Sequence, residues 1–166
     1  MTVREILTEP NKLLRQISET VEKIGDEERR LMDDMLDTMY AAPGIGLAAI
    51  QIGVAKRIIV MDISRDEIKK EPMYFINPII KNRNNEKAKY EEGCLSVPDQ
   101  FAEIERPNTC EVEYLDYDGK KKLLKADGLL ATCIQHEMDH LEGILFIDYL
   151  SKLKKSIIIK KLSKIK

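Results

Sequence analysis

The only two histidines lie four residues apart, in the segment His136-Glu137-Met138-Asp139-His140. Residues at i and i+4 of an α-helix share one face, about 5–6 Å apart at Cβ, so both imidazoles can reach one ion. Glu137 can then reach a water on that ion without binding the ion itself, as in metal-dependent hydrolases. Two buried structural histidines would leave a costly carboxylate on the same helix unexplained. The segment therefore predicts a single-metal hydrolytic centre.

A catalytic site of this kind needs a third protein ligand and an open position for water. Histidine is exhausted, and Asp139 and Glu142 point poorly toward an ion shared with the histidines. Cys133 precedes the first histidine by one helical turn. Cys94 stands in the segment 92–98, whose glycine and proline predict a loop that approaches the helix from outside. The residues alone favour Cys94 over Cys133 and leave both open.

The composition is that of a globular protein. The chain has 166 residues, 43% of them hydrophobic and 34% charged, and we expect one domain over 1–166. No run approaches the roughly 18–20 apolar residues that cross a bilayer, and we expect neither a secretory signal nor a membrane partner. The unevenly spaced Cys94, Cys110 and Cys133 predict no disulfide framework. A reducing, cytoplasmic setting is therefore expected.

Helical and strand patterns bracket the candidate residues. Residues 26–40 predict an amphipathic helix with Asp26 as its N-cap. Strand-forming runs are 57–63, 73–80, 110–115 and, after the turn Asp118-Gly119, a return strand near 121–125.

The helix that carries the histidines is expected to begin after Asp127, near Gly128, and to stop at Gly143. It is strongly apolar, so we expect it to be the central buried helix. Ser151 can cap a last helix. The apolar side of that helix would hold Leu153, Ile157, Ile158, Leu162 and Ile165. These elements predict an α+β fold, with antiparallel or mixed β-sheets packed around the central HExxH helix and a C-terminal helix.

Charge is unevenly distributed along the chain. Residues 151–166 contain seven lysines and no acidic residue, whereas the first 150 residues hold 20 basic and 29 acidic side chains. A basic tail on an acidic body predicts a polyanionic partner, and a solvated helix face is the alternative interpretation.

Three separated segments resemble motifs of the peptide deformylase family. They occur in the same order as in that family, and the resemblance extends over nearly the whole chain. They are Gly44-Ile45-Gly46-Leu47-Ala48-Ala49-Ile50-Gln51, Glu92-Gly93-Cys94-Leu95-Ser96 and Gln135-His136-Glu137-Met138-Asp139-His140. HExxH alone would point first to zinc proteases, and together the segments are specific. The resemblance implies that Cys94, His136 and His140 are the metal ligands and that Glu137 is the catalytic acid and base.

By this resemblance the substrates are N-formylmethionyl peptides, the nascent chains of bacterial-type ribosomes. A metal-bound hydroxide would attack the formyl carbon and release formate, with Glu137 transferring the proton. The Gln51 amide and the Leu95 backbone N–H would stabilise the oxyanion. The substrate would contact Gly44, Ile45 and Gly46, and its methionine side chain would contact Leu129 and Cys133. By its own sequence Gln51 is merely polar, and core packing explains Leu129 and Cys133 equally well.

Ligand rules for two imidazoles and one thiolate favour Zn²⁺, whereas the resemblance implies one Fe²⁺ per chain, with Ni²⁺ or Co²⁺ as active substitutes. Glu92 and Arg106 match an ion pair that steadies the Cys94 segment, with a surface salt bridge as the alternative. Phe101 replaces a basic residue of relatives, which puts a charged substrate contact in doubt. We expect the lysine-rich tail to dock on ribosomal RNA, and we expect no DNA partner. A zinc endopeptidase and a non-catalytic binder of nascent-chain N-termini are the competing hypotheses.

Overall fold

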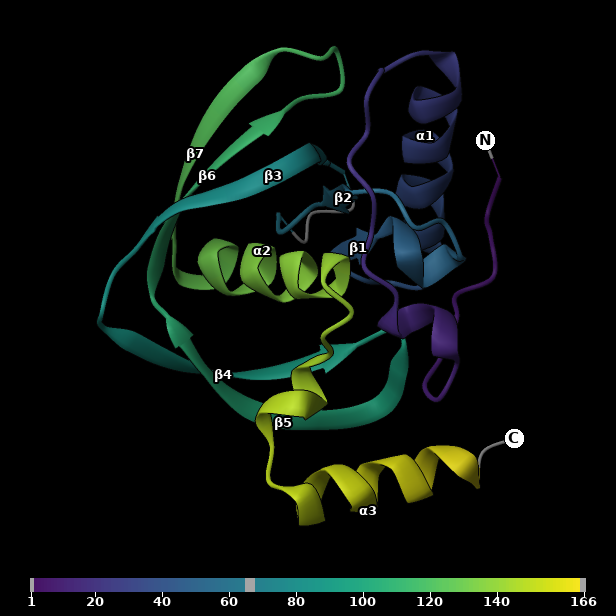
Figure 1. Ribbon diagram of the computed structural model, residues 1–166, viewed down its shortest axis with the longest axis vertical. Coiled ribbons are helices and arrows are strands. Elements are labelled where there is room, and N and C mark those ends of the chain that lie inside the picture. Colours follow the sequence, from purple (N-terminus) through teal and green to yellow (C-terminus); the bar gives the residue numbers. More distant parts are fainter. Residues whose placement is uncertain (1, 65–67, 165–166) are drawn as a thin grey trace.

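The helix with both histidines lies at the centre of the molecule. The computed structural model describes residues 2–64 and 68–164, and in it α2 (Gly128–Leu141) runs between a five-stranded sheet and a two-stranded hairpin (Figure 1). The strands are β1 (Gly46–Ala48), β2 (Ile58–Met61), β3 (Met73–Arg83), β4 (Lys87–Cys94), β5 (Val97–Pro107), β6 (Thr109–Leu115) and β7 (Lys121–Asp127). The other helices are α1 (Asp26–Ala41), α3 (Lys152–Ser163) and the 3₁₀ turns η1 (Lys12–Arg15), η2 (Ala49–Ile52) and η3 (Phe146–Tyr149).

The larger sheet has the order β1-β2-β3-β6-β7, and every neighbouring pair is antiparallel. Alternate side chains of a strand point to opposite faces, and here both faces are covered. Ile59 and Met61 of β2 pack with α2, whereas Ile58 and Val60 pack with α1. All of β2 is therefore buried. The α+β prediction, with antiparallel sheets around the HExxH helix, is confirmed.

The hairpin β4–β5 covers the other side of α2, and its two strands lie below the helix in Figure 1. It was not predicted: Cys94 was expected in an irregular loop. Instead Cys94 ends β4 and pairs with Val97 across a register shift, and Pro98 lies inside β5. Proline is tolerated because this sheet has only two strands, so an N–H on the outer edge needs no partner.

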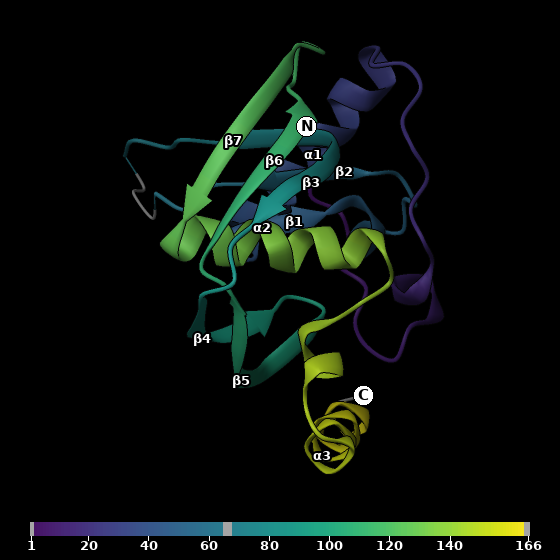
Figure 2. The same cartoon turned by 60° about the vertical axis from the view of Figure 1, so that its left-hand side comes forward.

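The C-terminal helix packs outside the hairpin, and Figure 2 shows it end-on below β5. The predicted cap is confirmed, because Ser151 Oγ accepts a hydrogen bond from Lys154 N at 3.2 Å. The predicted apolar side is partly wrong. Ile158 and Leu162 are buried against Phe146 and its neighbours, whereas Leu153 is 71% and Ile157 44% exposed. The C-terminal helix contacts only a narrow strip of the hairpin and η3, so only a few apolar residues of the helix are buried. Ile165 lies outside the described residues.

Two helix starts differ from the prediction in their capping. Gly25, not Asp26, is the N-cap of α1, and its N–H donates to Glu28 Oε1 at 2.9 Å. Asp127 does precede α2, but its side chain makes no capping hydrogen bond. Within the described ranges no helix combines the length and apolarity needed to cross a membrane.

Candidate active site

The structure brings Cys94, His136 and His140 together. Their ligand atoms all lie within 4.8 Å of one another, and Cys94 Sγ is 3.3 Å from His140 Nε2. Metal bonds of about 2.0–2.3 Å place two ligands of one tetrahedral ion roughly 3.5 Å apart. Among residues 2–64 and 68–164 no other set of three His, Cys, Asp or Glu side chains is so arranged. One thiolate and two imidazoles therefore form a donor set that fits a transition-metal ion.

The other candidate ligands lie elsewhere. Cys133 faces the pocket from α2 outside this group, and burial raises the pKa of its thiol. Asp139 Oδ2 pairs with Arg106 at 2.8 Å, and Glu142 Oε1 pairs with Arg57 at 2.9 Å. Neither carboxylate is directed at the histidines.

His136 is oriented by a buried ion pair. Its Nδ1 lies 2.9 Å from Glu92 Oε1. In a neutral imidazole the hydrogen then sits on Nδ1, and Nε2 keeps a lone pair for a ligand. Arg106 Nε and Nη2 donate to Glu92 at 2.7 and 3.0 Å. Burial opposes ionisation of Glu92, but the hydrogen bonds from His136 and Arg106 outweigh it and lower the pKa of its carboxyl. The surface-salt-bridge alternative is wrong, because Glu92 and Arg106 are 6% and 4% exposed.

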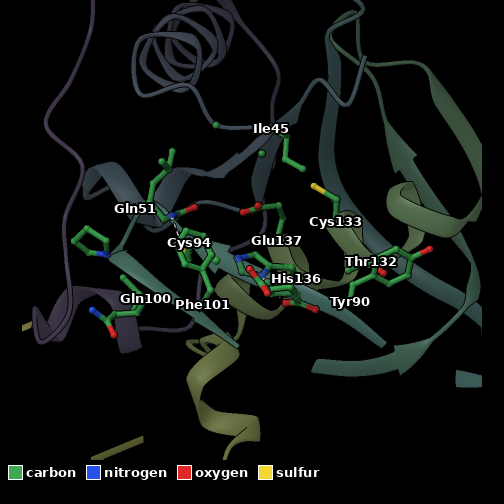
Figure 3. A pocket seen from close by; sticks show the side chains of 18 of the residues that line it. Ile45, Gln51, Tyr90, Cys94, Gln100, Phe101, Thr132, Cys133, His136 and Glu137 are labelled. Carbon is green, nitrogen blue, oxygen red and sulfur yellow. Dashed lines mark hydrogen bonds and ion pairs between the residues drawn. The ribbon is translucent and has the colours of Figure 1, made fainter. Parts of the chain in front are cut away.

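Glu137 faces the pocket from the same helix. It is 5% exposed, and among the described residues its Oε1 has no hydrogen-bond partner. Burial raises the pKa of Glu137 to about 7. Figure 3 shows its carboxylate directed across the site toward Gln51. A buried carboxylate with one free oxygen among the described residues and a pKa near neutrality is suited to proton transfer.

Gly46 makes room for that carboxylate. A Cβ at position 46 would lie 2.5 Å from Glu137 Oε2. We therefore expect Gly46→Ala to displace the Glu137 carboxylate and lower kcat about 100-fold, the loss typical of a misplacement of about 1 Å. Steady-state kinetics and thermal unfolding measure the effect. In the matched Gly25→Ala variant the new Cβ would lie 3.6 Å from Glu28, and turnover should be that of the parent. Parental kcat in a folded Gly46→Ala protein would contradict this reading.

Gln51 is held rigidly on η2. Its Oε1 accepts from Ala48 N at 2.9 Å, and its Nε2 donates to Ser96 Oγ at 3.0 Å and to Cys94 Sγ at 3.4 Å. The N-terminal segment supports Gln51 and Ser96, since Leu7 N donates to Gln51 O at 2.7 Å and Glu9 N donates to Ser96 O at 2.8 Å. The amide donor of Gln51 is thus fixed beside Cys94 Sγ, between β1 and the hairpin tip.

A pocket of about 530 Å³ opens over these groups. One wall is Gly44, Ile45 and Gly46. The hairpin and α2 form the others with Tyr90, Cys94, Leu95, Phe101, Leu129, Thr132, Cys133, His136 and Glu137. His140 lies behind, against Cys94. Phe101 is 64% exposed on the rim, beside Gly93.

Sequence reasoning missed Tyr90, Ser96 and Thr132. Tyr90 and Thr132 line the pocket, and Ser96 holds Gln51. Ser96 belongs to the segment that resembles the family around Cys94, but its role depends on its burial, which the sequence does not show. The other two carried no signal in the sequence.

Comparisons with known proteins agree on one family. Residues 3–156 match the sequence model of the polypeptide deformylase family. The peptide deformylase of Pelagibacter ubique is 87% identical over 100% of this chain and 96% of its own length. A crystal structure of peptide deformylase from Ehrlichia chaffeensis in complex with actinonin has a TM-score of 0.94 and 48% identity, covering 100% of this chain and 99% of its own. The plant peptide deformylase PDF1B has a TM-score of 0.92 at 30% identity, covering 99% and 90%.

Proposed function

Because the chain belongs to the polypeptide deformylase family of metal enzymes, we propose that it hydrolyses the formamide of N-terminal formylmethionine in newly made polypeptides, releasing formate. The observation that carries this proposal is the buried carboxylate of Glu137, whose Oε1 has no hydrogen-bond partner in the described part of the chain. It lies beside the Cys94, His136 and His140 cluster, in a pocket open to solvent.

We assign the metal to Cys94, His136 and His140, one divalent ion per chain. The donor atoms fit such an ion, and the hydrogen bond from His136 Nδ1 to Glu92 leaves its other nitrogen free to bind. A bound ion supplies Lewis-acid chemistry, because it polarises a carbonyl and makes water more acidic. We propose Fe²⁺ as the native ion, with Zn²⁺, Ni²⁺ or Co²⁺ as alternatives.

Proton transfer is assigned to Glu137. It accepts a proton from the attacking water and returns it to the leaving amine, and a pKa of about 7 suits both steps. The oxyanion is assigned to the Gln51 amide and the Leu95 backbone N–H. Ala48 and Ser96 hold the Gln51 amide in place, and its second N–H, now 3.4 Å from Cys94 Sγ, is the donor that would turn to the oxyanion. One such donor is typically worth about 2.7–4 kcal/mol of barrier.

The substrate is assigned to the pocket walls. The Gly44, Ile45 and Gly46 backbone would align the peptide at the open edge beside β1. Leu129 and Cys133, on the α2 wall, would contact the methionine side chain. Both face the pocket from the same helix as the metal ligands.

The test is formate release from formyl-Met-Ala-Ser by protein purified anaerobically and loaded with Fe²⁺ or Ni²⁺. We expect formate and intact Met-Ala-Ser in equal amounts. Cleavage at an internal peptide bond would instead indicate an endopeptidase. No formate from metal-loaded protein would refute the proposal.

For the basic tail we propose docking on ribosomal RNA near the exit of the peptide tunnel, in the cytoplasm of a bacterial-type cell. Lys155 pairs with Asp148 at 2.7 Å, but other lysines of this segment are exposed: Lys152, Lys154, Lys160, Lys161 and Lys164. They form a cationic surface, and α3 itself contains no acidic residue.

We expect ribosome binding to weaken linearly in log affinity against log salt, because phosphate contacts release counterions. Lys160→Gln with Lys164→Gln should lower the affinity and reduce the slope by about 0.7 per lost phosphate contact. Co-sedimentation with ribosomes at several salt concentrations measures both. The matched pair Lys120→Gln and Lys125→Gln removes the same charge elsewhere and should have no effect. Equal losses in the two pairs would contradict docking through α3.

A further inference from the structure

We propose that Tyr149 is a positioning residue for the metal site. Tyr149 fixes the orientation of His136 through a chain of contacts that runs by way of Asp139, Arg106 and Glu92. The inference rests on the proposed function, because it takes His136 as a metal ligand. Each link is a short polar contact between side chains from four different elements: η3, α2, β5 and β4.

The first link sets the direction of the ligand ring. Glu92 Oε1 lies 2.9 Å from His136 Nδ1 and also accepts from Arg106 Nη2 at 3.0 Å. A rotation of the Glu92 carboxylate would therefore turn the imidazole or break its hydrogen bond. Partners of this kind orient a ligating histidine and tune its basicity.

The second link is the guanidinium of Arg106. Two of its nitrogens hold Glu92, and the third, Nη1, donates to Asp139 Oδ2 at 2.8 Å. The guanidinium is planar, so its donors move together. Its side chain is 5% exposed, and water can scarcely substitute for either carboxylate. The position of Asp139 thus fixes the plane of the Arg106 guanidinium, and with it the direction of the two N–H donors that bind Glu92.

The third link is Tyr149. Its hydroxyl donates to Asp139 Oδ2 at 2.7 Å, the same oxygen that Arg106 contacts. Its ring also lies against the guanidinium, with 4.9 Å between the Arg106 Cζ and the ring centroid. One side chain therefore restrains both ends of the Asp139–Arg106 pair.

Core packing does not explain this residue, because Tyr149 is 52% exposed. Removing its hydroxyl leaves the ring and its contact with Arg106 and uncovers no apolar surface. A loss of metal affinity without a comparable loss of fold stability would therefore report positioning. Tyr149 ends η3, two residues before the cap of α3, so the chain between α2 and the C-terminal helix supplies part of the support of the metal site.

The experiment loads the full-length protein with Co²⁺, whose visible absorption reports ligand geometry. It measures the spectrum, the rate of Co²⁺ release to excess chelator, and thermal unfolding. Tyr149→Phe should shift the spectrum and speed release about tenfold, the lower end of the range for partners of a metal ligand. The matched control is Tyr40→Phe, which removes a similar bond, Tyr40 Oη to Asp62 Oδ2 at 2.6 Å, on the opposite side of the sheet. It should release Co²⁺ at the parental rate.

A double-mutant comparison tests the path. In Asp139→Ala the hydroxyl has lost its acceptor, so adding Tyr149→Phe should speed release little further. A parental release rate in Tyr149→Phe, equal effects of Tyr149→Phe and Tyr40→Phe, or additive effects with Asp139→Ala would each overturn the inference. A parent that takes up no Co²⁺ would overturn the proposed function and this inference with it. Parental uptake combined with an unchanged Tyr149→Phe protein would overturn this inference alone.

Discussion

Cys94→Ala is expected to give a folded protein that retains no metal ion during purification and releases no formate. Cys94 is the last residue of β4, its Sγ lies 3.3 Å from His140 Nε2, and it supplies the one sulfur of the cluster. Removing it leaves two imidazoles on one helix and opens the site from the hairpin side. Loss of a partner of a ligand already lowers metal affinity about 10–100-fold, so loss of the ligand itself should lower it by more than about 100-fold.

Metal content and formate release, measured on the same anaerobic sample, check this result. Cys133→Ala is the matched control, because that thiol is buried on α2 but lies outside the ligand cluster. It should keep its metal, and its effect should appear in KM for methionyl substrates. A Cys94→Ala protein with one ion per chain, or a Cys133→Ala protein that loses its ion, would indicate that Cys133 and not Cys94 is the third metal ligand.

Glu137→Gln is expected to lower kcat about 10²–10⁴-fold, the usual contribution of a general acid and base. The amide keeps the shape of the side chain but cannot accept the proton. The substitution also removes a buried carboxylate whose Oε1 has no partner among the described residues. Burial of an unpaired charge is costly, so the variant should unfold at the same temperature as the parent or higher.

Single-turnover kinetics, metal analysis and calorimetry on Glu137→Gln separate chemistry from binding. Glu142→Gln is the control on the same helix end, since Glu142 is surface-exposed and pairs with Arg57. It should retain parental turnover. Turnover within twofold of the parent in Glu137→Gln would refute the role of Glu137 in proton transfer.

Local sequence signals were sufficient to predict those helices and strands whose formation depends on nearby residues. The HExxH helix and the hairpin around Asp118-Gly119 were predicted near their observed bounds, because apolar periodicity and turn residues act over short distances. The β4–β5 hairpin was missed because many of its side chains are charged and because Gly93 and Pro98 break the residue pattern typical of a strand, although both lie inside the strands. Its order comes from packing against α2 and η3, which no local pattern reveals.

The same distinction holds for the site. The spacing of His136 and His140 located the helix of the candidate metal site. The residues by themselves left Cys94 and Cys133 open, and the choice of Cys94 came only from the family resemblance. That choice depends on where the hairpin tip meets α2. Ser96 and Tyr149 act only through contacts with residues far away in the chain, so their positions suggested no role. The roles of the site residues and the single-domain organisation stay predictions.

The most direct test of the central claim measures metal content and formate release together on one anaerobically purified preparation of the full chain. We predict one divalent ion per chain and formate release from formyl-Met-Ala-Ser in proportion to that ion. Activity should disappear on chelation and return when Fe²⁺ or Ni²⁺ is added. Formate release that persists without metal, or a preparation with one ion per chain that releases no formate, would contradict the account.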